Sequence, residues 1–434
     1  MVPRLWRVDA MTGFFIFLFS LLLLGFPIFI ALLMAVLLFM AMDNVPNLNV
    51  VIQRMFSGVD SFPLMAIPFF ILAGTMMASG GLSRRIVRLA QAIVGSFPGG
   101  FGMTTVSGSM FFSAISGSSP ATVVAVGKLM FPAMVRAGYT PRSTIGLLMS
   151  SGSLGIVIPP SIFMIVYGAV TGTSIGALFL AGVGAGLVYG ICFLVFCYVH
   201  ARWTGLPVQE RPPLSEVWSA FKGAAWGLAI PFIILGGIYG GVFTPTEASA
   251  VAVVYATFVT MVVYRELSLR ELFEVLRDSA TLTAQVMIIL TAAAAFSWFI
   301  STSGVTRNLA VTVLTITENP VAVLLLINLI VLIAGMLLDP TSIVVIIAPI
   351  VYAVATQVGV DPVHLGAILA VNAAVGMFTP PLGLNLFVAS SVGDVSYADA
   401  IIGVLPLILI ALAALLLVTF IPAISLWLPS TVYR

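Results

Sequence analysis

The sequence predicts an all-α polytopic membrane protein with two inverted repeats, and three observations lead to this fold class. Of 434 residues, 61% are hydrophobic and 7% are charged, and many apolar runs reach the roughly 20 residues that cross a bilayer core. Gly155 stands four residues before Pro159-Pro160, and the pattern recurs about 221 positions later at Gly376. Lysine and arginine gather on one side of the expected topology.

Each of these Gly-to-Pro-Pro segments predicts a broken transmembrane helix. Proline lacks a backbone donor and clashes with the preceding turn, while glycine tolerates unusual dihedral angles. The carbonyl groups freed by unwinding need a partner inside a membrane, and a bound cation is a natural one. We expect the broken helices to cover residues 143–170 and 364–391.

Further matched segments divide the chain into two repeats. Ser118 to Thr122 corresponds to Leu338 to Ser342, and Gly81 to Arg84 corresponds to Gly304 to Arg307. The sequence therefore predicts a first repeat at 1–203, a proline-containing cytoplasmic linker at 204–223 and a second repeat at 224–434.

A Pro-centred turn in each repeat predicts a re-entrant hairpin, at 100–137 and 320–357. Each arm holds about 15 residues, and at 1.5 Å per residue it falls short of the roughly 30 Å of a full crossing.

The remaining apolar and amphipathic runs complete the expected repeat. The first run, Phe14 to Met42, is interpreted as one permanent helix. An amphipathic segment precedes a separate helix in each repeat, and a long helix ends it. The expected ranges are 48–56, 62–79 and 176–199, and then 267–277, 281–300 and 399–428. Glu247, close after Pro245, is expected to cap a helix.

Orientation follows from the basic residues. With a cytoplasmic N-terminus, most arginines lie in cytoplasmic segments, whereas Arg54, Arg307 and Arg434 lie on the other side. The first hairpin then enters from the cytoplasm and the second from the opposite face, so the repeats are inverted. Inverted repeats with paired broken helices are typical of secondary transporters.

Four motifs in order resemble the large membrane subunit of the tripartite ATP-independent periplasmic (TRAP) transporters, the DctM-like family, over essentially the whole chain. They are Ser116 to Thr122, Gly155 to Ser161, Gly241 to Ala248 and Gly376 to Gly383. The resemblance implies a bacterial inner-membrane protein of the ion-transporter-superfamily type that imports an organic acid with sodium by an elevator motion. It also implies a periplasmic substrate-binding protein and a small four-helix membrane subunit, expected as a separate chain because the first long helix begins near Phe14.

The hairpin tips and breaks are expected to supply the oxygen ligands that sodium prefers. The first predicted sodium site is Ser116, Ser118, Ser119, Gly155 and Val157; the second is Asp339, Thr341, Gly376, Phe378 and Thr379. The organic acid is expected between the tips, reached by Thr122, Ser153, Ser342, Asn372 and Asn385. Helix packing is the open alternative for the serines and asparagines, and a helix cap is the alternative for Asp339.

Other function classes have less support. A stand-alone sodium- or proton-coupled carrier of the dicarboxylate or citrate type is the main alternative. Such a carrier differs from the tripartite transporters in needing no soluble receptor. An intramembrane enzyme is the remote one, because no acid, base and nucleophile converge and His200 and His364 lie far apart in the repeat plan. No nucleotide-binding loop is present, and no nucleic-acid partner is expected.

Overall fold

The computed structural model describes residues 8–42, 48–304 and 319–433, together with residues 311, 315 and 317. Throughout these residues the regular structure is helical, and seven helices are long and apolar enough to cross a membrane, or eight if a bent pair counts as one span. The all-α polytopic prediction is confirmed. Two predictions involve residues outside these ranges. They are the repeat match at Gly304 to Arg307 and the assignment of Arg4, Arg7 and Arg434 to one side of the membrane.

The first half of the chain contains two short apolar helices, an amphipathic helix, and a series of packed helices that ends in a long span. Its elements are α1 (Val8–Leu23), α2 (Ile28–Met42), α3 (Leu48–Val59), η1 (Phe62–Met65), α4 (Ala66–Ser79), α5 (Leu82–Val94), α6 (Gly100–Ser116), α7 (Ser119–Arg136), α8 (Pro141–Gly152), α9 (Leu154–Val157), α10 (Ile162–Thr171) and α11 (Ile175–Thr204).

The second half also combines long apolar helices with shorter ones. Its elements are α12 (Leu214–Tyr239), α13 (Pro245–Thr257), η2 (Phe258–Val263), α14 (Leu269–Thr302), α16 (Pro320–Gly335), α17 (Pro340–Gln357), α18 (Pro362–Gly376), α19 (Leu384–Gly393), α20 (Tyr397–Phe420) and α21 (Ala423–Val432). The prediction that Glu247 caps a helix is confirmed, since it forms a capping box with Thr244 at the start of α13.

The interpretation of Phe14 to Met42 as one helix is wrong, because the chain turns between α1 and α2. Gly25 has φ of +83°, a left-handed conformation that glycine adopts without steric cost. Pro27 directly precedes α2, and at the start of a helix the missing N–H of proline removes no helical hydrogen bond. The two helices hold only 16 and 15 residues.

Two other expected boundaries are also wrong. The segments at 267–277 and 281–300 form one helix, α14, of 34 residues, which begins at a capping box of Ser268 and Glu271 and contains neither proline nor glycine. The long helix expected at 399–428 ends at Phe420, because Pro422 interrupts it before α21.

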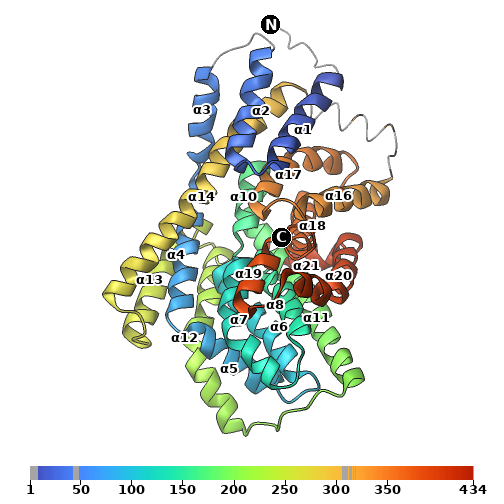
Figure 1. Ribbon diagram of the computed structural model, residues 1–434. Coiled ribbons are helices and arrows are strands. Elements are labelled where there is room, and N and C mark those ends of the chain that lie inside the picture. The colour runs from blue at the N-terminus through green and yellow to red at the C-terminus, as the bar shows by residue number, and fades with distance from the viewer. Residues whose placement is uncertain are drawn as a thin grey trace.

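Many of the helices belong to one of two packed groups. In the view of Figure 1, α3, α4 and α13 lie to the left of α6, α7 and α8. A lateral group consists of α2, α3, α4, α13 and α14, in which α4 packs against α13 and α14, and α14 packs against α2 and α3. A central group consists of α6 to α11 and α16 to α20. Within it the halves are interleaved, since α7 packs against α19 and α10 packs against α17. Each broken helix therefore contacts a hairpin arm of the other half.

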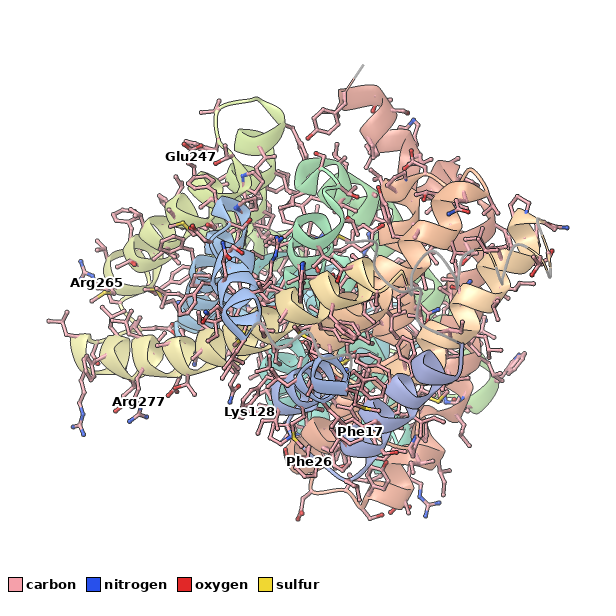
Figure 2. All side chains as sticks on the ribbon, turned by 90° about the horizontal axis from the view of Figure 1, so that it is seen from above. Phe17, Phe26, Lys128, Glu247, Arg265 and Arg277 are labelled. Carbon is pink, nitrogen blue, oxygen red and sulfur yellow. The ribbon has the colours of Figure 1, made fainter. Side chains whose placement is uncertain are left out.

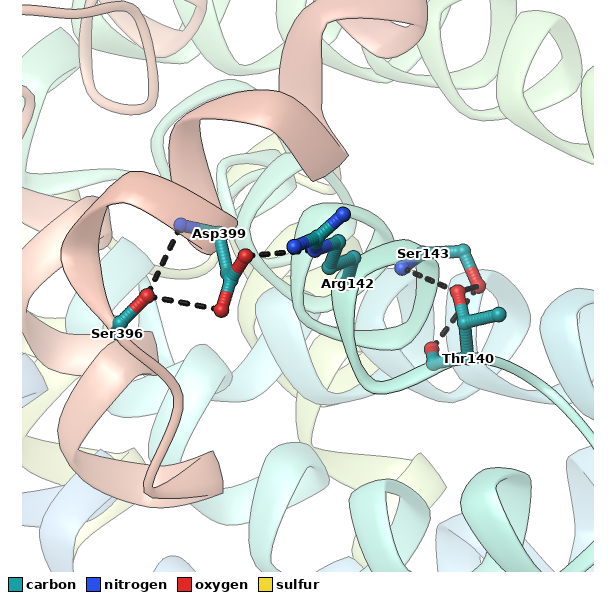
Figure 3. Close-up of polar contacts among 5 residues, drawn as sticks. All are labelled: Thr140, Arg142, Ser143, Ser396 and Asp399. Carbon is teal, nitrogen blue, oxygen red and sulfur yellow. Dashed lines mark hydrogen bonds and ion pairs between the residues drawn. The ribbon is translucent and has the colours of Figure 1, made fainter.

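A close contact between the halves joins α8 to α20. A Cβ atom at Gly146 would lie 2.2 Å from the carbonyl oxygen of Gly403, so the two backbones touch. Beyond this contact, Arg142 Nε lies 2.6 Å from Asp399 Oδ1, and Ser396 caps α20 beside it (Figure 3).

The outer surface is apolar over most helices, as a bilayer requires. Phe232 of α12 is 78% exposed and Leu409 of α20 is 68% exposed. Charged side chains such as Arg265 and Arg277 extend from the edge of the bundle (Figure 2). Burying these apolar surfaces in lipid is favourable, whereas exposing them to water would not be.

Candidate functional site

The first hairpin tip meets the first helix break directly. The tip lies between α6 and α7, where Gly117 has φ of +60°. The broken helix bends by 41° between Val157 and Ile162. A Cβ atom at Gly155 would lie 2.6 Å from the carbonyl carbon and oxygen of Ser118. Glycine at this position is therefore what allows the break to touch the tip.

Hydroxyl groups and carbonyls form a buried network within this tip. Thr122 Oγ1 donates to the Ser118 carbonyl at 2.8 Å and lies 3.1 Å from Ser116 Oγ. Thr122 is fully buried and Ser116 is nearly so. Thr122, predicted to contact substrate, thus belongs to the tip itself. The Val157 carbonyl lies on another side, where a Cβ atom at Gly182 of α11 would be 2.7 Å away.

Asn385 of α19 joins this first tip across the two halves. Its Nδ2 donates to Ser119 Oγ at 2.8 Å and to the Met149 carbonyl at 2.9 Å, and Ser119 Oγ in turn lies 3.0 Å from Asn385 Oδ1. All these groups are buried. The sequence placed Asn385 between the tips, and the structure brings it to the first one.

Ser153, predicted to contact substrate, is bonded within the first half. Its hydroxyl donates to the Ser150 carbonyl at 2.7 Å and lies 3.0 Å from the hydroxyl of Tyr189. Tyr189 is completely buried on α11. Tyr189 was not among the predicted site residues, although a tyrosine inside a long apolar helix is a signal that a polar partner is nearby.

The second tip and break also touch through glycine. A Cβ atom at Gly376 would lie 2.6 Å from Gly335 Cα, so α18 and α16 meet backbone to backbone. In the loop after α18, Leu382 N donates to the Met336 carbonyl at 3.1 Å. Unwound backbone from residue 377 to residue 383 therefore lies against the second hairpin.

Asp339 caps α17 at this second tip. Its carboxylate accepts hydrogen bonds from Thr341 N at 2.9 Å, from Ser342 N at 3.3 Å and from the Ser342 hydroxyl. Thr379 donates instead to the Val375 carbonyl at 2.7 Å, and Phe378 is fully buried. The tip carries a charged oxygen group, as the sequence indicated, and the charge is held by the start of a helix, which favours it.

Asn372 lies one helical turn before the second break. Its Nδ2 donates to the backbone carbonyl and to Oδ1 of Asn328, each at 2.9 Å. Asn328 of α16 was not among the predicted site residues. The signal was present, since this amide is the only polar side chain in the apolar run of α16.

The polar groups at the two tips are mainly oxygen atoms, the ligand type that hard cations prefer. Among the described residues, no group of three or more His, Cys, Asp or Glu side chains could hold a metal ion. The tips provide hydroxyl, amide, carbonyl and carboxylate oxygens. Lys128, the basic residue nearest to the first tip in sequence, is exposed.

An ionic cluster outside the spanning helices joins the segment after η2 to α5, the helix that precedes the first hairpin. Glu266 lies 2.8 Å from Arg84 and 2.7 Å from Arg85 of α5, and the Arg85 guanidinium sits 3.8 Å from the ring centre of Tyr264. Partial burial raises the pKa of Glu266, but hydrogen bonds and charge from the two arginines outweigh this and hold the pKa below its usual value.

Comparison with known proteins shows similarity along nearly the whole chain. Residues 15–424 match the family model described as the tripartite ATP-independent periplasmic transporter, DctM component. The chain is 44% identical to a C4-dicarboxylate TRAP transporter large permease protein DctM of Pseudomonas aeruginosa, over 89% of this chain and 90% of the relative. It is 40% identical to an isethionate TRAP transporter permease protein DctMQ of Oleidesulfovibrio alaskensis, over 97% of this chain and 66% of the relative.

A solved structure shares the fold at low sequence identity. The YdaH transporter of Alcanivorax borkumensis, whose structure is described as having an unusual topology, superposes with a TM-score of 0.58. The similarity covers 87% of this chain and 88% of that one, at 16% identity. The arrangement of helices thus occurs in another transporter.

Proposed function

We propose that this chain, which belongs to the DctM component family of the tripartite ATP-independent periplasmic transporters, imports an organic acid together with sodium. The family establishes a transporter permease for organic acids and a multi-pass membrane protein. Sodium coupling, the elevator motion and the partners are the proposed part. The observation that carries the proposal is the pair of hairpin tips, each in backbone contact with a helix break through Gly155 or Gly376.

Two sodium ions are proposed, one for each tip and break. The first ion would use Ser116, Ser118, Ser119, Gly155 and Val157, and the second Asp339, Thr341, Gly376, Phe378 and Thr379. Each break packs closely on its tip, which favours oxygen ligands shared between the two. The carbonyl groups of unwound backbone in a membrane need a hydrogen-bond donor or a cation as a partner. In the first tip, however, the Val157 carbonyl lies close to Gly182 of α11.

The organic acid is proposed to bind between the tips. The predicted contacts are Thr122, Ser153, Ser342, Asn372 and Asn385. In this structure Thr122, Ser153, Ser342 and Asn385 have hydrogen-bond partners within the chain, so substrate contact requires some of these bonds to exchange. The relatives' names include a C4-dicarboxylate and a sulfonate, isethionate, and both classes are anionic.

The motion is proposed to carry the central helix group past the lateral group. Cavities along that boundary support a sliding interface. One of about 190 Å³ lies between α14 and the end of α10, and one of about 520 Å³ lies between the α10–α11 turn and Pro245 at the start of α13, with Ile238 of α12 also in its lining. They share Ser61 and Ala169 in their linings. A contact also crosses the boundary, since a Cβ atom at Gly74 of α4 would lie 3.0 Å from Ser116 Cα.

The proposed setting is the bacterial inner membrane, with the N-terminus and most basic residues cytoplasmic and the two halves inverted. The proposed partners are a small four-helix membrane subunit on a separate chain and a periplasmic binding protein. The fused name DctMQ of one relative, which is longer than this chain, is in keeping with such a subunit.

Uptake into proteoliposomes tests the proposal. The chain is reconstituted with and without its small subunit and binding protein, and a radiolabelled panel of organic acids is offered under an inward sodium gradient or an equal choline gradient. The proposal expects uptake that requires all three proteins and sodium. Uptake by this chain alone, or uptake indifferent to sodium, would contradict it in favour of a stand-alone or proton-coupled carrier.

A further inference from the structure

One buried oxygen atom next to the second break has no hydrogen-bond partner in the described part of the chain: Asn372 Oδ1. Asn372 is 0% exposed. A buried acceptor without a partner costs about 1–3 kcal/mol, so such an atom in a packed helix calls for an explanation. The amide is one turn before Gly376, where α18 ends.

The orientation of this amide is fixed by its neighbour. Asn372 Nδ2 donates at 2.9 Å to two acceptors, the backbone carbonyl and the Oδ1 atom of Asn328. Rotating the amide by half a turn would bring oxygen against oxygen at both places. The donor end therefore faces Asn328 of α16, and the acceptor end stays free.

Asn328 is itself held in place by a chain of buried polar groups. Its Nδ2 donates to Thr419 Oγ1 at 3.0 Å. The Thr419 carbonyl lies 3.2 Å from Nε2 of His364, whose Nδ1 lies 2.7 Å from Ser425 Oγ. These bonds connect α16, α18, α20 and α21. A network in which each member restrains the next fixes side-chain orientation more firmly than one bond does.

The first half has no such arrangement at the equivalent place. There Ser109 of α6 donates to Ser151 of α8 at 3.3 Å. A hydroxyl rotates freely and both donates and accepts, so this pair fixes no acceptor in one direction. Of these two equivalent pairs, only the one beside the second break therefore holds an amide oxygen in a fixed direction and without a hydrogen-bond partner.

We propose that Asn372 Oδ1 is an oxygen ligand for the coupling cation at the second break and that Asn328 is the positioning residue that keeps this oxygen free. The chemistry points to a cation because only the acceptor end of the amide lacks a partner. Sodium binds carbonyl oxygens of this kind, as at unwound helices. The assignment rests on the proposed sodium coupling and moves Asn372 from the substrate to the ion.

Sodium-dependent stability of the purified full-length chain tests the inference. The unfolding temperature is measured across a series of NaCl concentrations at constant ionic strength with choline chloride, which gives the half-saturating sodium concentration. Asn372→Ala is expected to raise this concentration about tenfold, a loss equal to roughly 1.4 kcal/mol. Asn328→Ala is expected to raise it by a smaller factor, with the half-saturating substrate concentration for uptake at saturating sodium unchanged.

A matched control separates positioning from packing. Ser109→Ala removes the equivalent pair in the first half and is expected to leave the half-saturating sodium concentration within about twofold of the wild type, close to the uncertainty of a single-site change. A merely structural role of Asn328 would lower the unfolding temperature equally in sodium and in choline, and that result would overturn the inference. If Asn328→Ala does not fold, Asn328→Ser keeps the backbone acceptor and a small polar group and is measured in the same way.

The outcomes also separate this inference from the proposed function. If sodium changed neither the unfolding temperature nor the uptake of the wild type, the sodium coupling itself would be refuted. A sodium-responsive wild type with unchanged half-saturating concentrations in both asparagine variants would refute the roles of Asn372 and Asn328 alone.

Discussion

The two tip-and-break units have the same backbone contacts but different side-chain chemistry. In both, a glycine of the broken helix touches the hairpin, Gly155 at Ser118 and Gly376 at Gly335. The first tip is uncharged and is bonded to Asn385 of the other half. The second has the carboxylate of Asp339 as a helix cap.

The difference indicates which features the two units share and which features belong to only one of them. Backbone approach depends on the absence of a side chain, so glycine stands at both breaks. The ligands are free to differ, because hydroxyl, amide and carboxylate oxygens can all face a cation. A neutral first site and a charged second site are therefore expected to bind sodium with unequal affinity.

The largest effect is expected from adding side chains at the breaks. Gly155→Val or Gly376→Val would place carbon within contact distance of backbone, and overpacking of this kind costs about 1–3 kcal/mol or more. We expect a lower unfolding temperature and lost uptake in both variants. Gly236→Val is the matched control, since a Cβ atom there would have no atom within 4 Å. Equal stability of all three would show that the contact is not required.

The next effect concerns the bond between the halves. Asn385→Ala leaves the buried Met149 carbonyl and Ser119 hydroxyl without this partner, at a cost of about 1–3 kcal/mol. A double-mutant cycle with Ser119→Ala, followed by chemical denaturation, is expected to give a coupling of at least about 0.5 kcal/mol. Strictly additive effects would mean that the first tip is not tied to α19.

The two helix caps are expected to differ as well. Asp339→Ala removes a cap that accepts two backbone hydrogen bonds, and it is expected to lower the free energy of unfolding by about 1 kcal/mol. The side chain of Ser118 makes no cap bond, so Ser118→Ala is expected to lower it by less than about 0.5 kcal/mol. Asp339→Asn keeps a cap acceptor but removes the charge. It is expected to retain stability and to raise the sodium concentration required for uptake; unchanged sodium dependence would exclude the carboxylate as an ion ligand.

The smallest effect is expected at the approach to the first unit, where Glu266 holds α5. Because the folded pKa of Glu266 is lowered, its contribution is present above the ordinary carboxyl value of about 4.3 and is lost as the pH falls through the folded pKa. The stability difference between the wild type and Glu266→Gln, followed by thermal unfolding from pH 7 to pH 3, is expected to be below about 1 kcal/mol at neutral pH and to vanish in acid. A difference that grows in acid would reverse the assigned sign.

Local signals in the sequence placed the boundaries of the paired helices well, because proline and glycine act on their own neighbourhood. Helices α6 and α7 lie within the expected 100–137, and α16 and α17 lie within 320–357. Local signals also misled: the apolar run from Phe14 to Met42 hid the turn at Gly25, and the polarity change inside α14 did not interrupt its backbone.

The site required long-range information that one sequence does not contain. Ser119 and Asn385 are 266 positions apart, and no repeat offset pairs them. Asn328 stands out in the sequence as a polar side chain in an apolar run, but its partners Asn372 and Thr419 are 44 and 91 positions away. In both cases the contact depends on how helices pack across the interleaved halves and not on any local pattern.

The central claim is that each unit binds its own sodium ion during transport, and flux stoichiometry tests it most directly. Entry of radioactive sodium and of the labelled organic acid is measured in the same proteoliposomes containing all three components. The account predicts at least two sodium ions for each acid in the wild type, with fewer in Asp339→Asn. A ratio of one or less in the wild type would contradict it.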